Sequence, residues 1–176
     1  MPALSRLAYR SRQFWNAVFT PPRKVAGELL VPHLSPALTD LFWRMQPSEQ
    51  AHALMVMRRL QAAGQIDPDL LTAALLHDVG KSLAPLSVWD RVGIVLFKRF
   101  HPVADKEAKR PGGRGVRRAL RVAAWHPAWG AELAAEAGAG PLTIELIRRH
   151  QDAFTPRPDF PVDELLRALQ SADDEN

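Results

Sequence analysis

Hydrophobic residues recur along this chain at spacings of three and four, the period of an amphipathic α-helix, and alternating patterns typical of β-strands are hard to find. Ala, Leu and Arg are common and β-branched residues are sparse, which also favours helices. Breaks in the pattern separate helices that we expect at residues 5–19, 36–45, 47–63, 68–78, 87–100, 116–124, 127–138, 142–150 and 162–172. The sequence therefore predicts an all-α fold, a compact helical bundle.

Several of these boundaries carry explicit start and stop signals. Ser35 and Asp67 each precede a proline, the preferred order of an N-cap and a first helical residue. Gly64 is expected to stop one helix, and Pro127 to begin a new one. The glycine-rich residues 111–115 form the clearest loop. No linker or internal repeat divides the chain, so we expect a single domain.

Residues 70–76 are almost continuously apolar, which is typical of a helix buried in the centre of its domain. This helix ends at His77 and Asp78, and Gly80 is expected to supply a flexible exit. A carboxylate at the end of so apolar a helix is costly to bury unless a cation or a hydrogen-bond donor neutralises it. The sequence therefore indicates a metal site here, and the alternative is an ordinary helix end with a hydrogen-bonded His77 and a solvated Asp78.

The composition narrows what such a site can contain. The chain has 176 residues, enough for a substantial core, and no cysteine, so metal ligands must be His, Asp or Glu. No apolar run approaches the roughly 20 residues that span a bilayer, and we expect a cytoplasmic protein. The net charge is only +4, but residues 98–121 hold nine Lys or Arg and two acidic residues. Such a segment either attracts phosphates or is a solvated helix face.

Four histidines lie at helix positions beside plausible carboxylate partners. Imidazole and carboxylate form a mixed nitrogen and oxygen ligand set, which suits one or two divalent ions among Mn, Fe, Co, Ni, Mg and Zn. Each residue also has a purely structural reading, as a capping or polar-face histidine or as part of an acidic tail. The candidate metal ligands are His52, His77, Asp78, His126, His150 and Asp173.

Residues 75–81, Leu-Leu-His-Asp-Val-Gly-Lys, resemble the signature of the HD superfamily of metal-dependent phosphohydrolases. In that superfamily an earlier His, the His-Asp pair and a late Asp bind the metal. The resemblance implies an HD domain over residues 1–176, with N-terminal helices at 1–47 and a motif-bearing core at 48–174. It assigns the earlier His to His52 and the late Asp to Asp173, with the adjacent Asp174 as the alternative.

Two further motifs resemble the HD-GYP branch of this superfamily. Residues 125–133 are similar to its His-Pro-x-x-Gly-Ala motif, and residues 147–152 to its His-His-Glu motif. The resemblance implies that His126 and His150 complete a two-metal site. The chain departs from the branch at Gln151, which stands where the second His is expected, and no Gly-Tyr-Pro follows. These departures predict a weaker second metal site.

The resemblance implies hydrolysis of a nucleotide or another phosphomonoester or phosphodiester by metal-activated water. Asp78 is expected to bind metal and to orient the water. Lys81 and Arg149 are candidates for binding the substrate phosphate, and Lys81 is equally a surface lysine at a helix end. The expected partner is therefore a small molecule that carries phosphate.

The main alternative is a non-catalytic HD-fold module for signalling or scaffolding, which the substitution at Gln151 favours. The complete set of metal-ligand candidates favours an enzyme instead. We do not expect a nucleic-acid partner, because the basic segment lacks interleaved aromatic residues for base stacking. The oligomeric state is not predicted from these patterns.

Overall fold

The computed structural model describes residues 23–84, 115–152 and 161–174, and every regular element within these ranges is a helix. The prediction of an all-α fold is therefore confirmed for this part of the chain. The helices predicted at residues 5–19 and 87–100 lie outside it, as do residues 111–114 of the loop predicted at 111–115. Gly115, the last residue of that predicted loop, begins a helix instead. In chain order the elements are α2 (Arg23–Leu30), α3 (Pro36–Arg44), α4 (Pro47–Ala62), α5 (Pro68–Leu76), the short 3-10 helix η1 (Val79–Leu83), α7 (Gly115–Glu136), α8 (Pro141–Arg149) and α9 (Pro161–Asp174).

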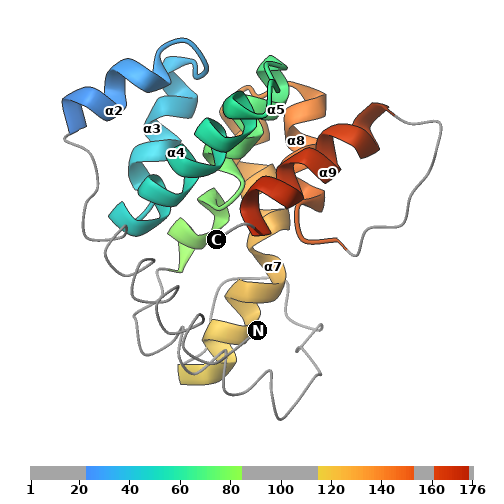
Figure 1. The fold of residues 1–176 in the computed structure, drawn as a ribbon. Helices are drawn as coiled ribbons and strands as arrows, with labels where there is room; N and C mark the ends of the chain where they lie inside the picture. The colour runs from blue at the N-terminus through green and yellow to red at the C-terminus, as the bar shows by residue number, and fades with distance from the viewer. Residues whose placement is uncertain (1–22, 85–114, 153–160, 175–176) are drawn as a thin grey trace, which may run out of the picture.

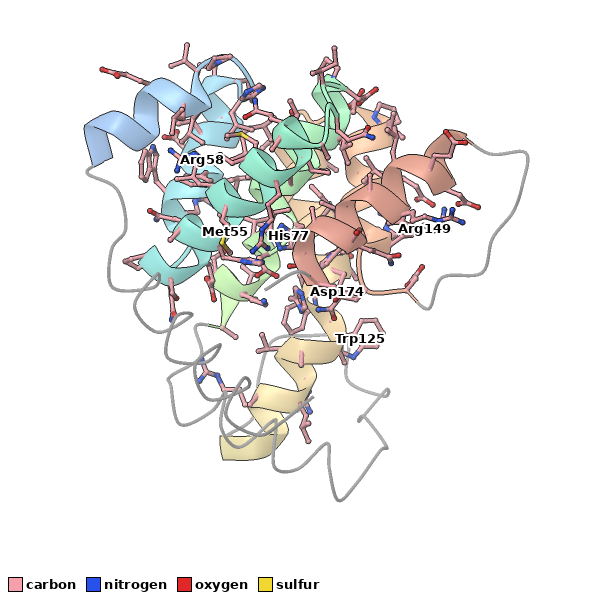
Figure 2. The ribbon with its side chains drawn as sticks, viewed as in Figure 1. Met55, Arg58, His77, Trp125, Arg149 and Asp174 are labelled. Carbon is pink, nitrogen blue, oxygen red and sulfur yellow. The ribbon has the colours of Figure 1, made fainter. Side chains whose placement is uncertain are left out.

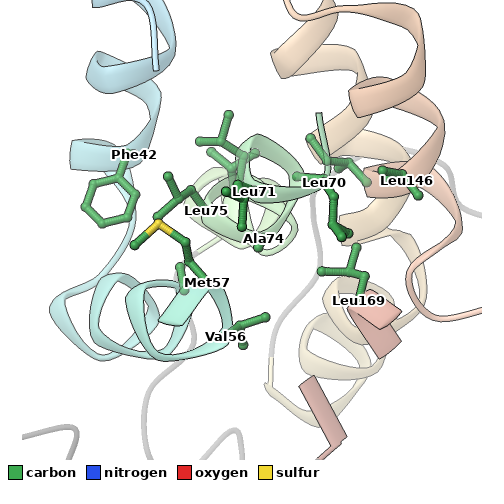
Figure 3. Close-up of a cluster of buried hydrophobic side chains, with 14 of the residues drawn as sticks. Phe42, Val56, Met57, Leu70, Leu71, Ala74, Leu75, Leu146 and Leu169 are labelled. Atoms are coloured by element: carbon green, nitrogen blue, oxygen red, sulfur yellow. The ribbon is translucent and has the colours of Figure 1, made fainter. Parts of the chain in front are cut away.

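Helix α5 lies in the middle of the molecule, with α3 and α4 on one side and α8 and α9 on the other (Figure 1). All of residues 70–76 are buried, as the apolar pattern predicts. Figure 3 shows Leu71 and Leu75 of α5 beside Phe42 and Met57, while Leu70 lies near Leu146. Burial of each such side chain contributes about 2 kcal/mol, so the core holds the end of α5 in a fixed place.

The predicted helix starts are confirmed in atomic detail. The Leu38 amide donates to Ser35 Oγ at 3.4 Å, and the Leu70 amide donates to Asp67 Oδ1 at 2.9 Å. Proline is the first residue of both helices, where its missing amide proton costs nothing. Gly64 follows α4 with a φ of +79°, the left-handed conformation that ends a helix.

Pro127 does not begin a helix, contrary to the sequence prediction. It lies inside the single helix α7. A proline within a helix removes one backbone hydrogen bond, but α7 packs along both η1 and α8. These tertiary contacts keep one helix where the sequence pattern predicts two. The short helix α2 was not expected either, although its Leu30 is fully buried in the core.

Gly80 allows η1 to pack directly against the backbone of α7. A Cβ atom at this position would lie 2.0 Å from the carbonyl oxygen of His126 and 2.7 Å from the amide nitrogen of Gly130. The positive-φ glycines of the described chain are Gly64 and Gly138, so Gly80 is not required for an unusual torsion. The expectation of a flexible exit is therefore wrong, because Gly80 provides the space that brings His126 close to Asp78.

We expect Gly80→Ala to lower the free energy of unfolding by about 3 kcal/mol or more, because the added methyl group meets backbone that cannot move aside. Gly130→Ala should cost about 1 kcal/mol, since its neighbours lie at 3.2 Å to 3.4 Å. Gly27→Ala is the control, because nothing lies within 4 Å of its added methyl group. Urea denaturation measures all three. Equal stability of the Gly80 and Gly27 variants would contradict the close packing of η1 on α7.

Candidate metal centre

The six predicted metal ligands come together from five helical segments. His52 lies in the middle of α4, and His77 and Asp78 directly follow α5. The other three are His126 within α7, His150 at the end of α8 and Asp173 in the last turn of α9. Figure 2 shows His77 among the helices near the centre of the molecule. The fold thus gathers residues separated by up to 121 positions in the sequence.

Three of these side chains form an outer group: His52, His77 and Asp173. His52 Nε2 lies 2.8 Å from Asp173 Oδ1 and 3.2 Å from His77 Nε2. The side chains of His52 and Asp173 are 23% and 24% exposed, whereas that of His77 is 1% exposed. The outer group therefore borders solvent on one side and the core on the other.

The remaining three form an inner group: Asp78, His126 and His150. His126 Nε2 lies 3.3 Å from His150 Nε2 and 3.3 Å from Asp78 Oδ1. All three residues are buried. Although Gln151 predicts a weaker second site, this group forms without that residue, which is exposed.

Asp78 stands between the two groups. Its Oδ1 faces His126, while its Oδ2 lies 3.7 Å from His77 Nε2. The imidazole rings also form a continuous series, since His77 lies 5.1 Å from both His52 and His150 between ring centroids, and His150 lies 5.2 Å from His126. The Asp78 carboxylate could therefore coordinate one ion in each group, through a different oxygen for each.

Backbone contacts determine which ring nitrogen carries the proton in three of the histidines. Nδ1 lies 2.9 Å from the Ala74 carbonyl oxygen in His77 and 2.7 Å from the Ile147 carbonyl oxygen in His150. In His126 the Nδ1 lies 2.9 Å from the carbonyl oxygen of Val122. A carbonyl oxygen only accepts, so each Nδ1 donates. In the neutral imidazole Nε2 is then an acceptor, which is the form that binds metal.

In the inner group, three acceptor atoms consequently face one another: His126 Nε2, His150 Nε2 and Asp78 Oδ1. His150 is neutral near pH 7, because burial and the neighbouring His77 and His126 lower its pKa to about 3. Two acceptor nitrogens at 3.3 Å repel each other unless a cation lies between them. That cation is either a proton or a metal ion. Burial also lowers the pKa of His77, which leaves its Nε2 available as an acceptor.

The two carboxylates are ionised. Burial alone would raise the pKa of Asp78, but Lys81 and His77 hold it well below its ordinary value. Lys81 Nζ donates to Asp78 Oδ2 at 2.6 Å. Burial likewise acts to raise the pKa of Asp173, while its hydrogen bond with His52 and its electrostatic interaction with His77 lower it to about 2. Both side chains thus have the charged form that divalent cations prefer.

Of the two adjacent late aspartates, Asp173 contacts His52, whereas Asp174 is exposed. The structure therefore places Asp173 in the outer group. Arg149, a predicted phosphate ligand, donates to Asp163 Oδ1 at 3.1 Å and lies toward the edge of the molecule in Figure 2. Its guanidinium also lies 3.6 Å from carboxylate oxygens of both Glu145 and Asp152. The contact with Asp163 links α8 to α9, and phosphate binding by Arg149 stays a prediction.

Two residues that hold the ligand-bearing helices together, Gln170 and Arg59, were not singled out from the sequence. Each binds backbone carbonyl groups of another helix. Such contacts leave no local sequence pattern, because any accessible carbonyl can accept. Most of the basic segment at residues 98–121 lies outside the described residues.

No family model matches this chain, and no curated protein or solved structure matches it. The resemblance to the HD superfamily therefore rests on the motif at residues 75–81 and on the side chains gathered around it. Membership of that superfamily stays a prediction. No helix in the described part of the chain is long and apolar enough to cross a membrane.

In metal-free protein kept in EDTA, we expect the free energy of unfolding to fall as the pH is lowered from 7 toward 5. His150 titrates near 6.5 when unfolded but near 3 when folded, so the unfolded state binds more protons in this window and acid favours it. Each such histidine lowers the free energy of unfolding by up to about 1.4 kcal/mol for each pH unit of acidification. Urea denaturation across this range should show a flatter dependence for His150→Gln. Identical slopes for His150→Gln and wild type would contradict burial of a neutral imidazole.

Proposed function

We propose that this protein is a metal-dependent phosphohydrolase of the HD type, acting on a nucleotide or another phosphomonoester or phosphodiester. The observation that carries this proposal is the inner group, where three acceptor atoms face one another in a buried place. His52, His77 and Asp173 would hold one ion, and Asp78, His126 and His150 a second. Nitrogen and carboxylate ligands without sulfur suit Mn, Fe, Co, Ni, Mg or Zn.

Bound divalent ions would supply Lewis acidity toward a phosphoryl group and a water molecule. The chain itself supplies the ligand side chains and the positive charge of Lys81 beside them. Lys81 is 25% exposed and contacts Asp78, so its ammonium group borders both the ligands and solvent. A phosphate that binds an ion held by Asp78 would lie close to this ammonium group. We infer that Lys81 binds substrate and that Asp78 holds the metal and orients the water.

A non-catalytic HD-fold module for signalling or scaffolding is the second candidate. One observation favours it: Lys81 already neutralises Asp78, and His52 already pairs with Asp173. The outer group and the Asp78 carboxylate of the inner group are therefore partly satisfied by the protein alone. The His126 and His150 Nε2 atoms are not, because these histidines have used their Nδ1 donors on backbone carbonyls. Metal binding by the inner group separates the two candidates.

Protein purified without chelator is expected to contain about two equivalents of divalent metal, measured by inductively coupled plasma mass spectrometry. His126→Ala should retain about one equivalent, and the double variant His77→Ala with Asp78→Ala should retain almost none, because it removes ligands of both groups. His33→Ala, outside both groups, should match wild type. Wild-type protein without metal, even after incubation with Mn²⁺ or Fe²⁺, would overturn the hydrolase proposal and favour the scaffold.

Lys81→Met should keep its metal but lose about tenfold or more in kcat/KM toward a phosphate ester, since a charge-assisted hydrogen bond contributes about 1.5–3 kcal/mol. The assay is phosphate release from a panel of nucleotides and phosphodiesters. Arg58→Met removes the same charge from an exposed position of α4 and serves as the control. Equal losses in both variants would show that only net charge matters and would exclude a specific role for Lys81.

A further inference from the structure

The side-chain amide of Gln170 binds the end of helix α8. Its Nε2 donates to the carbonyl oxygens of His150 at 3.1 Å and of Asp152 at 3.0 Å, with the Arg149 carbonyl oxygen at 3.5 Å. The last carbonyls of a helix have no partner within it. The Arg149 carbonyl also accepts from the Asp152 amide at 2.8 Å, and the Gln170 amide adds a bond to the His150 and Asp152 carbonyls. Gln170 thereby fixes the backbone of His150 to helix α9.

A second hydrogen bond joins the last turn of α9 to helix α4. Arg59 Nη1, from α4, donates to the carbonyl oxygen of Ala172 at 3.0 Å. Ala172 directly precedes Asp173, and α4 also carries His52. Arg59 therefore fixes the last turn of α9 to the helix that supplies the neighbouring ligand.

We propose that Gln170 and Arg59 are positioning residues for the metal centre, each serving one ligand group. Gln170 holds His150 in the inner group, and Arg59 holds Asp173 against His52 in the outer group. This inference rests on the proposed function, because it requires that both groups bind metal. In this proposal, α9 holds the inner and outer ligand groups at a fixed distance from each other.

The contacts that remain after each substitution explain why each residue serves only one ligand group. When Gln170 is changed, Arg59 still anchors α9 to α4, and the ion pair between Arg149 and Asp163 still joins α8 to α9 at 3.1 Å. The segment that is released is the backbone that follows Arg149, at His150 and Asp152. The His150 ring is attached to this segment, and its Nδ1 contact with the Ile147 carbonyl oxygen remains as a weaker restraint. Loss of Gln170 therefore displaces an inner ligand and leaves the outer ligands in place.

The test is Co²⁺ binding, measured by isothermal titration calorimetry together with the visible absorption of the bound ion. Gln170→Met and Arg59→Met remove the donors and keep much of the side-chain volume. Each is combined with His52→Ala, which leaves only the inner group complete, and with His126→Ala, which leaves only the outer group complete. Groups that hold metal ligands in place typically change affinity by about 10–100-fold.

We expect a crossed pattern. Gln170→Met should weaken Co²⁺ binding about tenfold or more in the His52→Ala protein and less than about twofold in the His126→Ala protein. Arg59→Met should do the reverse. A purely structural role would weaken binding equally in both backgrounds and would overturn the proposal. Circular dichroism verifies folding, and Gln170→Asn, which is too short to reach the carbonyls, replaces Gln170→Met if that variant does not fold.

Two controls and one rescue complete the design. Gln61→Met and Arg58→Met make the same chemical changes at exposed positions of α4 and should leave Co²⁺ binding unchanged. Gln170→Lys retains a donor at the end of α8 and should restore most of the affinity lost in Gln170→Met. Failure of wild-type protein to bind Co²⁺ would overturn the proposed function as well. Normal wild-type binding without the crossed pattern would overturn the positioning roles alone.

Discussion

Acceptor atoms that face one another in a buried place require a cation, and the structure around Asp78, His126 and His150 is organised by that requirement. The Nδ1 atoms of both histidines donate to carbonyl groups of their own helices, so their Nε2 atoms meet as acceptors at 3.3 Å. Leaving a buried polar group unsatisfied costs about 1–3 kcal/mol. A divalent ion would relieve the conflict and would use the lone pairs for coordination. In the proposed function, stability and metal binding would depend on the same atoms.

The rest of the fold serves to bring these acceptors together. The apolar helix α5 fixes the position of His77 and Asp78 at its end, and Gly80 lets η1 approach α7 so that His126 reaches Asp78. Helix α9 contacts α4, α5 and α8, and it binds the helices that carry His52 and His150 through side chains and carbonyls. The candidate metal centre therefore lies where the helices converge.

Features that depend on residues close together in the sequence could be predicted, whereas contacts between distant segments could not. The caps at Ser35 and Asp67 and the burial of residues 70–76 follow from nearest-neighbour rules, and the structure confirms them. The six candidate ligands were identified through motifs, and they do lie together. Pro127 was misjudged because packing on η1 and α8 outweighs its local preference. The contacts of Gln170 were not foreseeable, because side chain to carbonyl bonds between distant segments leave no trace in the sequence.

The most direct test of the metal centre is anomalous X-ray diffraction from crystals grown with Mn²⁺ and measured near the manganese absorption edge. We expect two anomalous peaks, one among His52, His77 and Asp173 and one among Asp78, His126 and His150. Absence of a peak at the inner group, with His126 Nε2 and His150 Nε2 still 3.3 Å apart, would show that a proton links these nitrogens. That result would contradict a two-metal centre.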